Sequence, residues 1–272
     1  MCRQLAYVGP PVALSRLFFE PPHSLEHQSY APRELLEGHV NADGFAVAWY
    51  PPVDADGHAV GALGDPGEPL VYRSERPAWG DPTWGGLAHR LPGRIVLANI
   101  RNATDPATGG LASVHPFTEG RWSFTHNGYL SGFREHLYRR MGAELSEKRY
   151  RARRGSSDTE TLFQLLMDRV EEGLSGAEAL KWLVQRAASA ATDAGKPGFL
   201  NFLLSDGQRV WATRYSTTPK QASLYTGENL DSWPGATLVA SEALDEDPGW
   251  KRVPESSIVT LEPGKPPRVE SL

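Results

Sequence analysis

Two consecutive helical segments interrupt an otherwise strand-rich chain, and this order restricts the fold more than any other feature. Leu162, Leu165 and Leu166 recur on one helical face between about residues 159 and 172. A second pattern of this kind covers about residues 177–191. A doubly wound parallel sheet needs strands and helices in alternation. Strands, then a helix pair, then more strands instead predict an α+β fold built in layers.

Apolar runs of strand type lie on both sides of the helix pair. Strands are expected at residues 2–8, 45–50, 70–73, 94–101 and 121–126, and again at 199–204, 209–215, 223–225, 237–240 and 258–261. We expect Gly9-Pro10-Pro11 to end the first strand and Asn127-Gly128 to form a tight turn. Residues 79–84 are expected to form a loop. No repeat or long linker divides the chain, so 1–272 is expected to be one domain.

Composition excludes several classes of function. The net charge of -5 disfavours a nucleic-acid or anionic-membrane partner, which would favour a basic surface. There is no apolar run of membrane-spanning length and no signal peptide at the start. A single cysteine fits a reducing compartment, so a cytoplasmic protein is expected. The histidines are scattered and no second cysteine is present, so neither a metal nor a cofactor is expected. Nothing in the sequence indicates an oligomeric state.

The one cysteine, Cys2, directly follows the initiator Met1. Cysteine is small enough to permit removal of the preceding methionine, which would place a thiol and a free α-amine on one residue. Such an amine has a pKa of about 7.7–8.0, close to the operating pH that suits a general base. A lone cysteine can also simply fill a small apolar gap. Both interpretations remain open on this residue alone.

Five further polar motifs lie at strand ends or turns, where functional sites are often found. They are Asn41-Ala42-Asp43-Gly44, Arg101-Asn102-Ala103-Thr104, His115-Pro116-Phe117, His126-Asn127-Gly128-Tyr129 and Ser157-Asp158-Thr159-Glu160. Each has an ordinary structural explanation. An Asn-Gly pair is typical of a hairpin turn, a Ser-x-x-Glu pattern is a capping box, and a strand-end arginine is usually solvated. Only their occurrence together with Cys2 favours a catalytic site.

In this order the motifs resemble those of the class II glutamine amidotransferases, which are N-terminal-nucleophile hydrolases with a four-layer αββα sandwich. Further segments resemble the ergothioneine-biosynthesis amidohydrolases (EgtC); they are Met1-Cys2-Arg3, 28–33, Trp79-Gly80-Asp81, Ala240-Ser241-Glu242, Gly249-Trp250 and Val253-Pro254. The resemblance implies hydrolysis of the γ-glutamyl amide of γ-glutamyl-hercynylcysteine S-oxide to glutamate and hercynylcysteine S-oxide. The alternative is a glutaminase component that supplies ammonia to a separate synthase. A binding protein without activity would have no need of the terminal thiol.

The resemblance also implies a role for each matching residue. The Cys2 amine would take the thiol proton while the sulfur attacks the γ-carbonyl and forms a thioester. The Asn127 side-chain amide and the Gly128 backbone N–H would stabilise the oxyanion. Arg101 would bind the substrate α-carboxylate, and Asp158 would accept from its α-ammonium. A small-molecule γ-glutamyl compound is therefore the expected partner.

The remaining expected site residues surround the substrate. Thr104 and the His115 segment would line the glutamyl pocket. Because aromatic faces commonly hold quaternary ammonium groups, a ring cage for the trimethylammonium of the leaving group is a further hypothesis; its candidates are Trp79, Trp84, Tyr30 and Tyr50. The competing interpretation is that Trp79 and Trp84 pack their loop onto the core.

Overall fold

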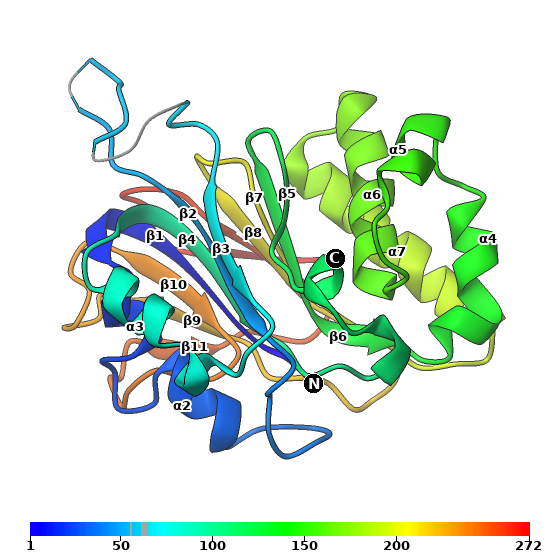
Figure 1. Ribbon diagram of the computed structural model, residues 1–272, viewed down its shortest axis with the longest axis horizontal. Coiled ribbons are helices and arrows are strands. Elements are labelled where there is room, and N and C mark those ends of the chain that lie inside the picture. The colour runs from blue at the N-terminus through cyan, green and yellow to red at the C-terminus, as the bar shows by residue number, and fades with distance from the viewer. Residues whose placement is uncertain (55, 61–64) are drawn as a thin grey trace.

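Two antiparallel sheets form the centre of the computed structural model, which describes residues 1–54, 56–60 and 65–272 (Figure 1). The seven-stranded sheet has the order β11-β9-β10-β1-β4-β2-β3, and the six-stranded sheet has the order β13-β12-β8-β7-β6-β5. The strands of the first sheet are β1 (Arg3–Ala13), β2 (Phe45–Tyr50), β3 (Leu70–Ser74), β4 (Pro92–Ile100), β9 (Tyr225–Glu228), β10 (Thr237–Ala240) and β11 (Trp250–Arg252). Those of the second are β5 (Phe117–Glu119), β6 (Trp122–Leu130), β7 (Gly198–Ser205), β8 (Val210–Arg214), β12 (Ser257–Leu261) and β13 (Arg268–Ser271).

Helices cover the outer face of each sheet (Figure 1). The seven-stranded sheet is covered by α1 (Ser15–Phe18), α2 (Leu25–Tyr30) and α3 (Pro82–Ala88), and the six-stranded sheet by α4 (Tyr138–Gly142), α5 (Glu147–Ala152), α6 (Asp158–Glu171) and α7 (Gly176–Asp193). Short turns of helix complete the chain at η1 (Ala78–Gly80), η2 (Pro106–Thr108), η3 (Leu111–Ser113) and η4 (Phe133–Leu137). This arrangement confirms the predicted α+β fold with αββα layers.

The period-2 geometry of the strands explains the layers. Along β1, Leu5 and Tyr7 point into the core beneath the helices of the seven-stranded sheet. The alternate residues Ala6 and Val8 point into the core between the two sheets. Strands buried on both faces are typically apolar at nearly every position, and the continuous apolar run of β2 (Phe45–Tyr50) fits this pattern.

Three local predictions from the sequence were wrong. Strand β1 continues beyond Gly9-Pro10-Pro11 because its register with β4 shifts between Val8 and Val12, and a bulge tolerates residues that cannot donate. Asn127-Gly128 is not a turn but lies inside β6, paired residue by residue with β7. Residues 79–84 include the start of helix α3, which Asp81 caps by accepting from the backbone N–H of Trp84 at 3.1 Å.

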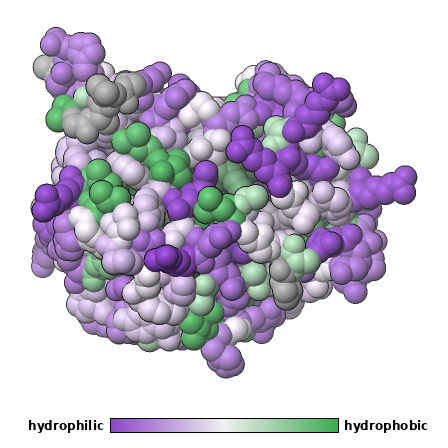
Figure 2. All heavy atoms as spheres, in the orientation of Figure 1, coloured by the Kyte–Doolittle hydropathy of each residue, from purple (hydrophilic) through white to green (hydrophobic). Residues whose placement is uncertain are grey.

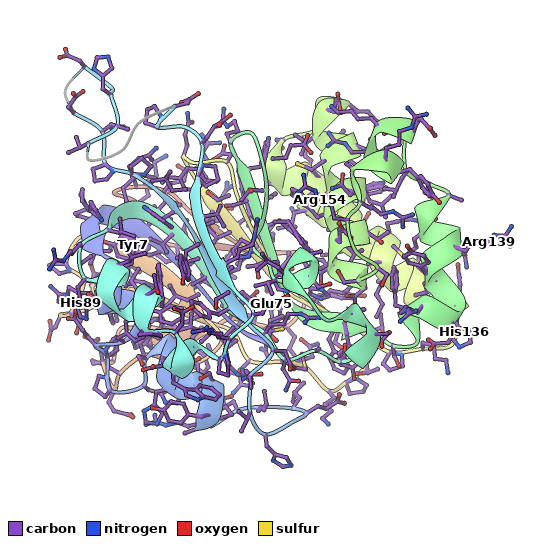
Figure 3. All side chains as sticks on the ribbon, viewed as in Figure 1. Tyr7, Glu75, His89, His136, Arg139 and Arg154 are labelled. Atoms are coloured by element: carbon purple, nitrogen blue, oxygen red, sulfur yellow. The ribbon has the colours of Figure 1, made fainter. Side chains whose placement is uncertain are left out.

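The surface seen in Figure 2 is predominantly hydrophilic over the α4–α7 side, while hydrophobic residues gather over the sheet side of the same face. On the helical side, His136 and Arg139 project away from the body of the protein (Figure 3). Among the described residues, none of the helices combines the length and the apolarity that a membrane crossing requires.

Candidate active site

Cys2 lies where strand β1 begins and strand β4 ends. The antiparallel register pairs Arg3 of β1 with Ile100 of β4. The residue that follows β4, Arg101, therefore lies beside Cys2 although it is distant in the chain. Cys2 is 5% exposed, and its Sγ lies 3.9 Å from the backbone carbonyl oxygen of Asn102. Strand pairing thus brings the thiol and the guanidinium together.

A small cavity of about 30 Å³ connects Cys2 with most of the predicted site residues. Six of these residues line the cavity: Cys2, Arg101, Thr104, His115, Gly128 and Asp158. They come from the start of β1, the segment after β4, the segment before β5, the middle of β6 and the first turn of α6. The structure therefore brings together side chains that the sequence places in five separate motifs.

Arg101 is a buried cation that is hydrogen-bonded to uncharged oxygen atoms. It is 6% exposed, and its Nη2 donates to the Thr108 carbonyl oxygen at 2.8 Å and to Thr108 Oγ1 at 2.9 Å. No carboxylate of the described residues forms a salt bridge with it. Asp43 and Glu75 share with Arg101 a neighbouring cavity of about 400 Å³, and Figure 3 shows Glu75 near the centre of the view. A guanidinium buried in this way is favourable mainly when an anion reaches it.

Backbone hydrogen bonds join the Asn41–Gly44 motif to Arg101. The backbone N–H of Asp43 donates to the Arg101 carbonyl oxygen at 3.1 Å, and Arg101 N–H donates to the Gly44 carbonyl oxygen at 2.8 Å. The Asp43 carboxylate accepts from Ala103 N–H at 2.8 Å. Gly44 has φ +98, a conformation that residues with a Cβ rarely adopt. This motif therefore supports the site through the backbone rather than through the cavity.

Asp158 joins the first turn of α6 to the end of β6. Its Oδ2 accepts from the backbone N–H of Leu130 at 2.8 Å, and its Oδ1 accepts from the backbone N–H of Thr159 at 2.6 Å. A carboxylate has about four lone-pair sites, so Asp158 retains capacity for a further donor. Ser157 caps the helix by accepting from Glu160 N–H at 3.1 Å. Ser157 thus caps the helix, but the predicted capping box is incomplete, because the Glu160 carboxylate accepts from the backbone N–H groups of Arg154 and Gly155 instead. Asp158 in addition lines the cavity.

Gly128 occupies a position that admits no side chain. A Cβ there would lie 1.9 Å from the Phe199 carbonyl oxygen of the paired strand β7. That carbonyl also accepts from His126 Nε2 at 2.7 Å, so the Nε2 of His126 carries a proton. Burial lowers the pKa of His126, although the nearby Asp158 carboxylate acts to raise it. The backbone of β6 can therefore approach a bound group closely at residue 128.

His115 is a neutral hydrogen-bonding residue of the cavity wall. It is 3% exposed, and its Nδ1 lies 2.7 Å from Thr125 Oγ1. Burial, with repulsion from Arg101 and His126, holds the pKa of His115 well below its usual range. An uncharged imidazole leaves Arg101 as the cation available to a bound carboxylate.

Two of the predicted site residues do not line the cavity. Asn127 is completely buried, and its Nδ2 donates to Ser241 Oγ at 3.2 Å. Trp79 is 44% exposed and meets Tyr30 edge-on, with ring centroids 5.7 Å apart. The structure therefore leaves Trp79 outside the cavity that contains Cys2.

Two other rings of the cage hypothesis have no exposed surface for a ligand. Trp84 is completely buried and stacks on Tyr72 with ring centroids 5.0 Å apart. Tyr50 is also completely buried, and its hydroxyl donates to the Arg121 carbonyl oxygen at 2.7 Å. Both rings belong to the core, which bears out the interpretation that Trp84 packs its segment onto the sheet.

A larger cleft of about 590 Å³ adjoins the cavity. The two share five lining residues: Asn102, Ala103, Thr104, Thr108 and Asp158. Met1 lies at the edge of this cleft, where its amine donates to the Glu37 carbonyl oxygen at 2.8 Å. Burial lowers the pKa of this amine from its usual value of 8.0. A terminal amine in these surroundings is therefore more readily neutral than one in water.

Among the described residues, one group of side chains has the spacing of metal ligands, and it lies away from the cavity. Asp54, Asp56 and His58 bring ligand atoms within 4.8 Å of one another. All three are exposed, and none of them lines the cavity.

Sequence reasoning gave no role to three residues that support the site. Thr108 holds Arg101, and no pattern in the sequence distinguishes it. Ser241 and Glu242 follow strand β10, and their segment has no sequence signal other than its resemblance to the ergothioneine-biosynthesis amidohydrolases. Their importance depends on what the two sheets bring against them.

Glu242 is a buried carboxylate on which several donors converge. It is 2% exposed, and its two oxygens accept from the backbone N–H groups of Arg33 and Glu34 at 2.9 and 3.0 Å. His23 Nε2 lies 2.6 Å away and Arg3 Nη1 3.5 Å away. Burial alone would raise the pKa of Glu242, but these partners together lower it. Glu242 therefore fixes Arg3, the neighbour of Cys2, against the 33–34 segment.

We expect Glu242→Gln to destabilise the fold by about 3 kcal/mol, because it leaves the Arg3 charge buried without its partner. The folded-state pKa of Glu242 is depressed, so its contribution is complete above the unfolded value of about 4.3 and is lost as the pH falls through the folded value. Denaturant unfolding of the wild-type protein and of Glu242→Gln between pH 3 and 7 measures this contribution. The difference between their free energies of unfolding should become smaller only at the acid end of this range. Glu246→Gln is the control, since that side chain is 86% exposed. Equal effects of the two variants would contradict the assigned role.

Comparisons with known proteins identify the family of this chain. The sequence profile of the class-II glutamine amidotransferases matches residues 20–224. The gamma-glutamyl-hercynylcysteine sulfoxide hydrolase of Mycolicibacterium smegmatis is 30% identical over 96% of this chain and 96% of its own length. A probable glutamine amidotransferase of Saccharomyces cerevisiae is 31% identical over 96% of this chain and 82% of its own length.

Solved structures show the same fold. A glutamine aminotransferase class-II domain protein from Silicibacter pomeroyi superposes with a TM-score of 0.68 at 26% identity, covering 99% of both chains. The glutamine phosphoribosylpyrophosphate amidotransferase of B. subtilis superposes with a TM-score of 0.61 at 17% identity, covering 99% of this chain and 49% of its own.

Proposed function

The chain belongs to the class II glutamine amidotransferases, and we propose that within this family of enzymes it acts as an N-terminal cysteine amidohydrolase. Its proposed reaction is cleavage of the γ-glutamyl amide of γ-glutamyl-hercynylcysteine S-oxide, which gives glutamate and hercynylcysteine S-oxide. The observation that carries the proposal is the cavity that Cys2 lines together with the carboxylate residue Asp158 and a buried Arg101, for which no carboxylate of the described residues forms a salt bridge. A thiol, a cation and an anion in one small space suit the free α-carbon of a γ-glutamyl group.

The proposed mechanism follows from these positions once Met1 is removed. The α-amine of Cys2 takes the thiol proton, directly or through one water, and the sulfur attacks the γ-carbonyl carbon. Gly128 N–H and the Asn127 amide stabilise the negative oxygen. The C–N bond breaks as the amine product leaves with the proton, and water then hydrolyses the thioester to release glutamate and regenerate the thiol.

The large cleft supports a substituted amide as the substrate. Glutamine would release only ammonia, for which a cleft of about 590 Å³ beside the cavity is unnecessary. The leaving group of the proposed substrate is far larger and would extend into this cleft past the shared residues Thr104 and Asp158. The 30% identity to the mycobacterial hydrolase over nearly the whole of both chains supports the same choice.

A glutaminase component that supplies ammonia to a separate synthase is the second candidate. It is favoured by the similarity to the probable glutamine amidotransferase of yeast. Release of glutamate from the γ-glutamyl sulfoxide and from glutamine, assayed with the same purified protein, separates the two. We expect turnover of the sulfoxide to exceed that of glutamine by a wide margin. Rapid turnover of glutamine with none of the sulfoxide would exclude the proposed substrate.

We expect Arg101→Lys to raise KM by about 10- to 100-fold while changing kcat much less. A lysine is charged but lacks the planar fork that holds a carboxylate through two hydrogen bonds, and a hydrogen bond to a charged group contributes about 1.5–3 kcal/mol. Steady-state kinetics with the γ-glutamyl substrate measures the change. An otherwise identical amide that lacks the α-carboxylate is the control, because Arg101→Lys should not affect its hydrolysis. An equal loss with both substrates would show that Arg101 does not bind the carboxylate.

A further inference from the structure

We propose that Ser241 is a positioning residue, which anchors the Asn127 side-chain amide through a hydrogen bond and so keeps its second N–H in place for the oxyanion. This inference rests on the proposed function, in which Asn127 is an oxyanion donor. Ser241 is completely buried, and its Oγ accepts from Asn127 Nδ2, so Ser241 would act through Asn127 rather than on the substrate.

Strand pairing holds the hydroxyl of Ser241 in place. Strand β10 pairs with β1 through Leu5 and Ala240. The pairing extends one residue further, because Ser241 N–H donates to the Gln4 carbonyl oxygen and Gln4 N–H donates to Ser241 Oγ, both at 2.9 Å. The hydroxyl is therefore tied to the strand that begins next to Cys2.

The same hydroxyl reaches across to the second sheet. Asn127 lies on β6, and its Nδ2 donates to Ser241 Oγ at 3.2 Å. One hydroxyl oxygen thus accepts from the strand of the nucleophile and from the amide of the oxyanion donor. This shared contact fixes the position of the Asn127 amide relative to strand β1, which begins next to Cys2, although β1 and β6 belong to different sheets.

The hydroxyl of Ser241 is the hydrogen-bond partner that anchors the Asn127 amide. Nδ2 donates one hydrogen to Ser241 Oγ, whereas Oδ1 is buried and has no hydrogen-bond partner among the described residues. The second hydrogen of Nδ2 has no acceptor among the described residues and would be available to the oxyanion. Without the Ser241 hydroxyl the amide loses this anchor, and its N–H is no longer held in one place.

A double-mutant cycle tests this role. We expect Asn127→Ala to lower kcat by about 10²–10³-fold, the usual loss for an oxyanion donor. Ser241→Ala should lower kcat by about 10-fold, the equivalent of one hydrogen bond, and leave KM within about twofold. In the Asn127→Ala background, Ser241→Ala should cause no further loss, because residues that act through one another are not additive.

The controls separate positioning from a general effect on the fold. Ser205 is also a buried serine of the sheet framework, and its hydroxyl accepts from Gly207 N–H at 3.1 Å and donates to the Arg209 carbonyl oxygen at 2.8 Å. Ser205→Ala should lower the thermal stability about as much as Ser241→Ala does, but it should leave kcat unchanged. Ser241→Thr retains the hydroxyl and should retain most of kcat, which provides a folded variant if Ser241→Ala is unstable.

Three results would overturn the inference. Equal losses from Ser241→Ala in the wild-type and Asn127→Ala backgrounds would refute the positioning role and leave the proposed function intact. A Ser241→Thr variant that is stable but as slow as Asn127→Ala would exclude the hydroxyl as the active feature. Full activity of Asn127→Ala alone would remove the oxyanion role of Asn127 from the proposed function, and the role of Ser241 with it.

Discussion

Cys2→Ala is expected to abolish hydrolysis, with a loss in kcat of more than about 10⁴-fold, because removal of a catalytic nucleophile leaves only binding and oxyanion stabilisation. The fold should remain intact. Cys2 is buried at 5% exposure, but loss of one sulfur atom at the chain terminus should cost only about 1 kcal/mol. Glutamate release measures the first effect and thermal unfolding the second.

Cys2→Ser provides the matched comparison for this variant. A serine places a hydroxyl of similar size where the thiol was, but a hydroxyl is a much weaker nucleophile than a thiol near neutral pH. It should therefore also be severely impaired, and mass spectrometry should find no glutamyl thioester on either variant. Substantial turnover by Cys2→Ala at native stability would show that the nucleophile is another residue.

An extension that remains attached before Cys2 is expected to inactivate the protein almost completely, although every side chain is present. An amide nitrogen cannot serve as the base that takes the thiol proton, whereas a terminal amine with a pKa of about 7.7–8.0 can. The structure adds a steric reason. Met1 is itself buried at 3% exposure, with its amine on the Glu37 carbonyl oxygen, so an extended chain must displace this contact.

A protease site that releases Cys2 as the first residue gives the paired control, since one preparation supplies both forms. We expect activity to appear in proportion to the fraction of chains that begin at Cys2. Mass spectrometry of the intact protein measures this fraction. Full activity of a form whose mass proves that the extension is present would refute the terminal-amine mechanism.

Much of the architecture could be predicted because it depends on local periodicity. The apolar faces of α6 and α7 repeat at helical spacing, and the continuous apolar run of β2 indicates a strand buried on both faces. The prediction failed where long-range pairing overrode a local signal. Asn127-Gly128 has the composition of a turn. In the structure, pairing of strand β6 with strand β7, in which Asn127 lies opposite Asn201 and Gly128 opposite Leu200, keeps this pair extended.

The aromatic residues illustrate a different limit. Trp79 and Trp84 look alike in the sequence, five residues apart. Trp84 is completely buried in the core, whereas Trp79 is 44% exposed, and neither lines the cavity. A tryptophan can pack or bind equally well, so residue type alone does not predict which it does.

The chemical groups of the site can be identified from the sequence: a cysteine after the initiator methionine, an arginine at the end of a strand, an Asn-Gly pair and an acidic first turn of a helix. They follow from residue type and local pattern. Which of these groups come together is a property of the folded molecule. Antiparallel pairing places the end of β4 beside the start of β1, and the packing of two sheets brings Ser241 against Asn127. Such contacts join residues far apart in the chain, so they depend on how distant strands pair and how the sheets pack rather than on the residues next to them.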